Sequence, residues 1–211
     1  GITMQRARML LPLAWLVRTN DTAQSREWLL TIADGLLARQ DRATGAFREE
    51  VSAEGWGNAA ITPDNANYGT FESPLNQQNT DPVSDLLYTA PFALLGLHEA
   101  AAATGNETLR AAEDRLADFL MRAQTRSVER PEFDGAFFRA FDFDKHEVWG
   151  SDADAGWGAW SVETGWSQSW ITATLGLRLA NTSLWELTQG SVDLRPDLAE
   201  WQDFFFFPAG P

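Results

Sequence analysis

The sequence predicts an all-α fold, a partial α/α toroid of about two and a half helical hairpins with long loops on one face. Apolar residues recur at helical spacing in successive segments, and the connections between these segments alternate between short and long. Because alternate connections of antiparallel helices emerge at opposite ends, the long connections share one end. Loops longer than about 15 residues inside a compact domain are usually functional, so we expect a pocket at that end.

The first hairpin is predicted from its helical periodicity and its turn. One helix covers about residues 4–18, and a second runs to about Gln40. Between them, Asp21 and Gln24 have the spacing of a capping box, in which two side chains satisfy the free N–H groups of a helix start. A long polar connection, residues 41–80, follows the second helix.

The second hairpin begins where Asp81 and Pro82 have the pattern of an N-cap followed by proline at the first helical position. Pro91 should kink this helix or mark its true start. Gly105 is predicted to end it, and Asn106 to cap a helix that runs to about Gln124. After a second long connection, residues 125–163, we expect a helix at 164–180 and a short helical turn at 184–187.

A weak internal repeat supports a repeated helix pair. Gly45-Ala46-Phe47-Arg48 is echoed by Gly135-Ala136-Phe137 with Arg139 close behind, and each copy enters a long connection. A complete ring of six hairpins needs roughly twice these helices. We therefore expect residues 1–190 to form a partial toroid that is completed by an N-terminal part of the same protein or by a homo-oligomer. Residues 191–211 form a tail, whose four phenylalanines at 204–207 should pack on the helices or on the missing part.

Composition excludes several classes of partner and cofactor. The formal net charge of -14 over 211 residues argues against nucleic acid, which requires a basic face. The apolar run at residues 9–17 is too short to span a bilayer, so we expect no membrane partner. The chain has no cysteine, no phosphate-binding or dinucleotide fingerprint and no EF-hand loop, so neither a cofactor nor a metal is predicted. We expect a periplasmic or extracellular location.

Tryptophans interleaved with acids and glycines indicate a sugar-binding surface. Five of the ten tryptophans fall between Trp149 and Trp170. Flat indole rings stack on the C–H faces of sugars while carboxylates accept hydrogen bonds from hydroxyls; the alternative is that the rings fill the helical core. Arg48 and Arg139 could clamp a uronate carboxylate, or form structural ion pairs with Glu49 or Asp142. The candidate substrate-binding residues are Arg48, Tyr68, Gln77, Arg139, His146, Trp149, Asp152, Trp157, Trp160 and Trp166.

The carboxylates of the two long connections suit cleavage of a glycosidic bond, which needs one protonated acid and one ionised carboxylate. Asp81 and Asp85 lie at or near a predicted helix N-terminus, where the dipole favours the charged form of a base. Glu72 and Glu163 lie among aromatic residues, which raise a carboxyl pKa and suit a general acid. The alternatives are an ordinary N-cap for Asp81 and solvated loop acids for Glu72 and Glu163.

Four segments, 81–89, 95–105, 134–142 and 157–166, resemble the C-terminal half of six-hairpin glycosidase-like proteins from polysaccharide-degrading bacteria. The resemblance covers most of residues 4–190. The closest named family is glycoside hydrolase family 154, which implies β-glucuronidase activity on uronate-bearing glycans. Two alternatives stay open. One is a polysaccharide lyase on the same scaffold, with Tyr68 or His146 as base, and the other is a non-catalytic glycan-binding subunit.

Overall fold

A computed structural model describes residues 1–50, 79–149, 162 and 167–189, and this part of the chain is mostly helical. The helices are α1 (Ile2–Thr19), α2 (Ala23–Leu37), α3 (Thr89–Thr104), α4 (Glu107–Ala123), α5 (Ser167–Leu179) and α6 (Leu184–Thr188), with a 3₁₀ turn, η2, at Pro131–Phe133. The strands are β1 (Val83–Asp85), β2 (Ala140–Asp142) and β3 (Glu147–Val148).

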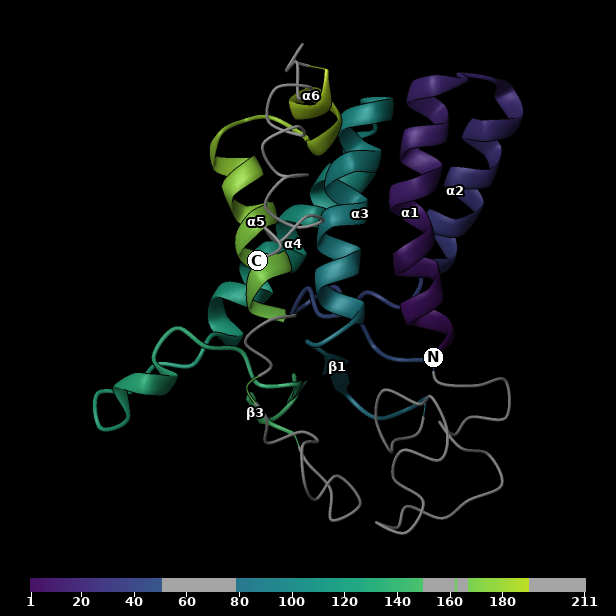
Figure 1. The fold of residues 1–211 in the computed structure, drawn as a ribbon. Coiled ribbons are helices and arrows are strands. Elements are labelled where there is room, and N and C mark those ends of the chain that lie inside the picture. Colours follow the sequence, from purple (N-terminus) through teal and green to yellow (C-terminus); the bar gives the residue numbers. More distant parts are fainter. Residues whose placement is uncertain (51–78, 150–161, 163–166, 190–211) are drawn as a thin grey trace, which may run out of the picture.

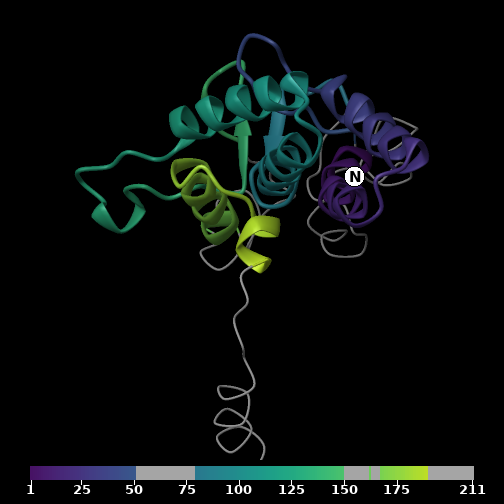
Figure 2. The same cartoon turned by 90° about the horizontal axis from the view of Figure 1, so that it is seen from above.

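The helices form an open array in which α3 is central. Helix α3 packs against α1, α4 and α5, and α1 packs against α2. Helices α1, α3 and α5 begin at one end of the array, and α2 and α4 run back toward that end (Figures 1 and 2). Twelve residues of α3 are buried, which explains why its sequence is apolar on nearly every face. The helical content agrees with the all-α expectation, while closure into a toroid stays a prediction.

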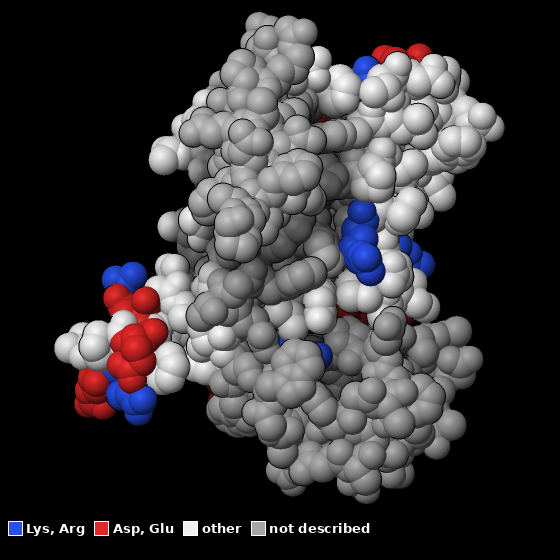
Figure 3. Space-filling model, in the orientation of Figure 1, with Lys and Arg blue, Asp and Glu red and all other residues white. Residues whose placement is uncertain are grey.

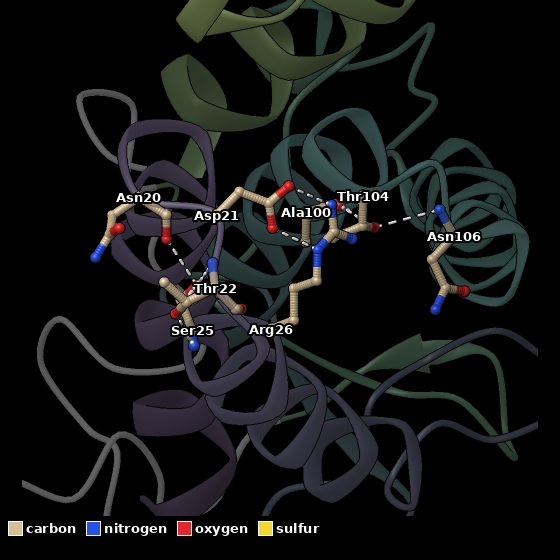
Figure 4. Close-up of polar contacts among 8 residues, drawn as sticks. All are labelled: Asn20, Asp21, Thr22, Ser25, Arg26, Ala100, Thr104 and Asn106. Carbon is tan, nitrogen blue, oxygen red and sulfur yellow. Dashed lines mark hydrogen bonds and ion pairs between the residues drawn. The ribbon is translucent and has the colours of Figure 1, made fainter.

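The two short connections lie together at the far end of the array (Figure 4). Gly105 has a left-handed φ of 68° and ends α3, and the Asn106 side chain accepts N–H bonds that cap α4, as predicted. The capping box of α2 begins one residue later than predicted, with Thr22 and Ser25 in place of Asp21 and Gln24. Asp21 binds Arg26 instead, at 2.5 and 2.8 Å.

The predicted helix start at Asp81 is wrong. Residues 83–85 form strand β1, and α3 begins at Thr89. Pro91 therefore lies in the first turn of α3, which agrees with the prediction that it marks the true start of the helix. The described part of the chain contains a three-stranded antiparallel sheet in the order β1-β2-β3, with Asp85 opposite Ala140 and Phe141 opposite Val148. Strands of two or three residues are too short to show a period-two pattern, so they could not be predicted from periodicity.

The remaining helices lie close to their predicted positions. Helix α2 ends at Leu37, three residues before the expected Gln40, and α4 ends at Ala123. Helix α5 is observed over Ser167–Leu179, and α6 covers Leu184–Thr188, where a short turn at 184–187 was predicted. Among the described residues, no helix combines the length and the hydropathy that crossing a membrane requires.

The repeat is visible as two turns with the same backbone. Gly45 and Gly135 have φ angles of 85° and 84°, a region that favours glycine. In the first turn the Gln40 side-chain amide donates to the Gly45 carbonyl at 3.1 Å, and in the second Gln124 donates to the Gly135 carbonyl at 2.7 Å. Counted from these glycines, Glu49 corresponds to Arg139. Arg48, which the sequence motif aligned with Arg139, is therefore one position out of register.

A charged segment that carries η2 projects from the array (Figure 3). It contains exposed ion pairs between Arg130 and Glu132 at 2.5 Å and between Arg126 and Asp134 at 3.7 Å. Exposed pairs of this kind add little stability. Because both signs of charge alternate along the segment, it does not provide a surface of one sign.

Candidate functional site: a buried carboxyl pair

Glu49 and Asp85 form a pair of completely buried carboxyl groups, each with 0% of its surface exposed. Their charges repel each other, which contributes to the raised pKa of Glu49. Both residues lie at the end of the array where α1 and α3 begin (Figure 1). The two long connections leave the described structure at this same end, after Glu50 and after Trp149.

Glu49 is held because both of its neighbours are fastened to the start of α1. The Thr3 hydroxyl donates to the carbonyl oxygen of Arg48 at 3.2 Å and accepts the N–H of Glu50 at 2.7 Å. The Glu50 carboxylate receives Arg6 and Arg39, each at 2.7 Å. These contacts fix the backbone on either side of Glu49 and leave its own carboxyl group out of the ion-pair cluster.

Asp85 is held by the turn that leads from β1 into α3. Its Oδ1 accepts the backbone N–H groups of Leu87 at 2.8 Å and Tyr88 at 3.1 Å. The sheet brings Arg139 to the same place, since Arg139 precedes β2 and its carbonyl accepts the N–H of Leu86 at 2.7 Å. Arg139 is only 4% exposed, and its positive charge favours the ionised form of Asp85.

The two carboxyls lie in different electrostatic surroundings. Burial, together with the charge of Asp85, raises the pKa of Glu49 to about 8. Burial also raises the pKa of Asp85, but the Arg139 charge and the N–H bonds of Tyr88 and Leu87 oppose the shift. At neutral pH Glu49 is therefore mainly protonated, and of the two carboxyls Asp85 is the one whose contacts favour a negative charge.

Several oxygens at this pair lack hydrogen-bond partners within the described ranges. They are both carboxyl oxygens of Glu49, Oδ2 of Asp85 and the Thr89 hydroxyl. The Thr89 hydroxyl lies close enough to Glu49 to lower its pKa but is not aligned as a well-formed hydrogen bond. Buried polar atoms without well-formed hydrogen bonds are costly and uncommon, so these oxygens are candidates for contact with a polar ligand.

Of the residues predicted for the site, the structure brings together Asp85 and Arg139. Asp81 lies before β1 and does not cap a helix. Arg48 donates to the Thr80 carbonyl at 2.6 Å, and its guanidinium lies 5.1 Å from the centre of the Phe143 ring. Neither of the two ion pairs considered for Arg48, with Glu49 or with Asp142, is formed within the described residues.

His146 and Trp149 lie on the small sheet. His146 is an exposed turn residue with a φ of 58°, and its ring meets the edge of Phe141 at 5.0 Å. Trp149 is half-buried against Val83 and Ala140. Asp142 holds the turn after β2 by accepting two backbone N–H groups. In the described part of the chain, no group of three or more His, Asp or Glu side chains is placed to hold a metal ion.

The other predicted site residues lie outside the described residues, and so does the tail at 191–211. They are Glu72, Glu163, Tyr68, Gln77, Asp152, Trp157, Trp160 and Trp166.

Glu49 is the functional candidate that sequence reasoning missed. It stands beside Glu50, and nothing in the local pattern separates a buried acid from one that binds arginines. Counting four positions on from Gly45 and from Gly135 would have aligned Glu49 with Arg139 and drawn attention to both.

Comparison with known proteins leaves this geometry as the main evidence, since no protein-family model, no curated protein and no solved structure matches the chain.

Proposed function

We propose that the chain is a glycoside hydrolase, or the C-terminal part of one, that acts on uronic-acid-containing glycans. The observation that carries the proposal is the buried pair, in which Glu49 keeps its proton at neutral pH and the contacts of Asp85 favour its negative charge. Hydrolysis of a glycosidic bond by two carboxyl groups needs this combination, with one group to protonate the leaving oxygen and one to act as base or nucleophile.

The contacts of each carboxyl assign its role. Asp85 receives two backbone N–H groups and faces Arg139, all of which stabilise a negative charge. Glu49 is completely buried beside that charge, and this raises its pKa to about 8. We therefore assign Glu49 as the general acid and Asp85 as the ionised carboxylate.

Arg139 supports an anionic substrate. The chain carries a net charge of -14, so its overall field repels anions. A buried guanidinium beside the carboxyl pair supplies local positive charge and a planar set of donors that suits a uronate carboxylate. Trp149, half-buried on the adjacent sheet, offers an indole surface near the same end.

Turnover of uronate-containing oligosaccharides by the native protein and three variants tests the assignment. Glu49→Gln and Asp85→Asn should each lower turnover by about 10²-fold or more, because each removes one half of the acid–base pair. Asp144→Asn is the matched control, since Asp144 is an exposed acid in the turn after β2, and it should retain normal turnover. Near-normal turnover in both pair variants would rule out the assignment.

The same assay separates the alternatives. A lyase would release an unsaturated uronate that absorbs in the near ultraviolet, whereas a hydrolase product does not. A glycan-binding subunit would bind the oligosaccharides without turning them over, and the pair variants would change affinity alone. The molar mass of the native protein, measured by light scattering, tests the proposal that a second copy or an N-terminal part of the same protein completes the ring.

A further inference from the structure

A second buried polar network lies away from the carboxyl pair and involves His98 of α3. Its Nδ1 lies 2.8 Å from Oε1 of Glu113, and its Nε2 lies 2.8 Å from the carbonyl oxygen of Thr182. Thr182 belongs to the connection between α5 and α6, so the ring joins α3, α4 and this connection. His98 is 8% exposed and Glu113 is 1% exposed.

Both partners of the imidazole are acceptors at these positions. A carbonyl oxygen has no proton to donate, and an ionised carboxylate has none either. A neutral imidazole carries one N–H, so it would leave one nitrogen lone pair facing an oxygen lone pair at 2.8 Å. Only the imidazolium, with two N–H groups, satisfies both contacts.

We propose that His98 is a pH-sensitive clasp that holds the α5–α6 connection on α3 while its ring is doubly protonated. When the ring loses a proton it keeps one partner. The charge-assisted bond to Glu113 is the stronger of the two, so the Thr182 contact is the one released.

The neighbouring residue strengthens the same attachment. The Glu99 carboxylate accepts the N–H groups of Leu184 at 2.6 Å and Trp185 at 3.3 Å, which begin α6, and also the indole N–H of Trp15 at 3.1 Å. Two consecutive residues of α3 therefore hold the start of α6 and the connection before it. The contact through Glu99 does not require a protonated histidine, so release of His98 should loosen α6 without detaching it.

Charged groups around the ring come from every element packed against it. Glu113 and Asp114 lie on α4 and both bind Arg178 of α5, at 2.5 and 2.8 Å. Glu99 lies beside His98 on α3, and Glu186 of α6 binds the N–H of Ser183 at 3.1 Å. Burial lowers the pKa of His98. Glu113, the Thr182 carbonyl and Glu99 raise it by more than burial lowers it, so the net shift is upward.

The sign of the pH effect follows from that shift. A group whose pKa is raised by folding contributes its full stabilisation below its ordinary pKa and loses it as the pH rises through the raised value. For His98 the attachment of the α5–α6 connection is complete below about pH 6.5 and weakens above it.

Hydrogen exchange of residues 182–188, measured on the full chain from pH 5.5 to 9.5, tests the clasp. After correction for the intrinsic exchange rate, protection should fall as the pH rises and then level off. The fall should be about tenfold for each pH unit by which the pKa of the held ring exceeds that of the released ring. Because the readout is local, titration of Glu49 at the other end of the array does not enter it.

Variants separate the clasp from general loosening. Glutamine at position 98 does not titrate, so His98→Gln should show lower protection at pH 6 and no further fall with pH. His146→Gln, which removes the exposed histidine, should keep the native profile. Nitrogen NMR of the imidazole in the native chain gives a reading that needs no variant, and it should show both ring nitrogens of His98 protonated at pH 6. A neutral His98 ring at pH 6, or pH-independent protection of residues 182–188 in the native chain, would overturn the proposal.

Discussion

The two glycine turns that follow α2 and α4 have similar backbones but bring different side chains, a carboxyl group and a guanidinium, to the candidate site. Each has a glycine with φ near 85°, a glutamine amide bound to the glycine carbonyl, and a buried phenylalanine two residues on. At the equivalent position after the glycine, the first turn presents Glu49 and the second presents Arg139.

The difference shows how a repeated element acquires a site. The shared turn fixes where the side chain is placed, and the residue type at that place decides what it does. Asp85, which lies in β1, interacts electrostatically with both residues: its charge helps to raise the pKa of Glu49, and the charge of Arg139 opposes the rise that burial causes in the pKa of Asp85. Three predictions test this contrast.

The largest effect is expected at Arg139. Arg139→Gln should destabilise the protein by about 3–5 kcal/mol, because removing one member of a buried pair leaves the other charge uncompensated. Urea unfolding at pH 7 measures the change. The double variant Arg139→Gln with Asp85→Asn is the control, and it should recover part of the loss. No recovery would mean that Arg139 stabilises the fold through packing alone.

The glycines should differ although their φ angles agree. At Gly45 a Cβ atom would lie 2.1 Å from the carbonyl oxygen of Arg115, whereas at Gly135 the nearest atom is Nε2 of Gln124 at 3.7 Å. Gly45→Ala should cost about 2–5 kcal/mol, the sum of left-handed strain and a clash with backbone. Gly135→Ala should cost about 1–2 kcal/mol, from the strain alone. Equal losses of unfolding free energy would show that the first turn can move away from α4.

Replacement of Glu49 should have an effect of the opposite sign. Glu49→Gln should stabilise the protein at pH 7, on the order of 2 kcal/mol, because the native state holds Glu49 protonated while the unfolded state ionises it. The native protein should lose stability from about pH 4.5, the ordinary pKa of Glu, up to about pH 8, and the variant should lose less over that range. Unfolding curves at pH 5, 6.5 and 8 measure the slope. A slope that the substitution leaves unchanged would mean that Glu49 ionises normally.

Sequence periodicity predicted the longer helices well because apolar residues recur at helical spacing along them, and capping residues such as Asn106 marked their ends. The small sheet escaped prediction because Asp81-Pro82 matches a helix start locally, while pairing with β2, far along the chain, makes this stretch extended. Tertiary contacts of that kind have no local signature.

The candidate site was only partly predicted, because contacts between distant parts of the chain decide which of its residues are buried. Asp85 and Arg139 were chosen from their positions beside a helix start and a repeat, and the sheet joins them. Glu49 and Glu50 are alike in sequence, and what separates them is the position of Thr3, Arg6 and Arg39, which come from other elements. Burial of one acid and pairing of the other are decided by packing.

The pairing of β1 with β2 also has a kinetic consequence. The helical hairpins close through neighbours in sequence, whereas this pairing joins two distant stretches of chain, which is slow because a long loop must close first. Helices should therefore form before the sheet, and Asp85 meets Arg139 only when the sheet closes. A chain with its hairpins assembled and its short sheet open would keep nearly all its helical signal but would lack the candidate carboxyl site. Helicity measured by spectroscopy is therefore a poor measure of the fraction of protein in which that site is assembled.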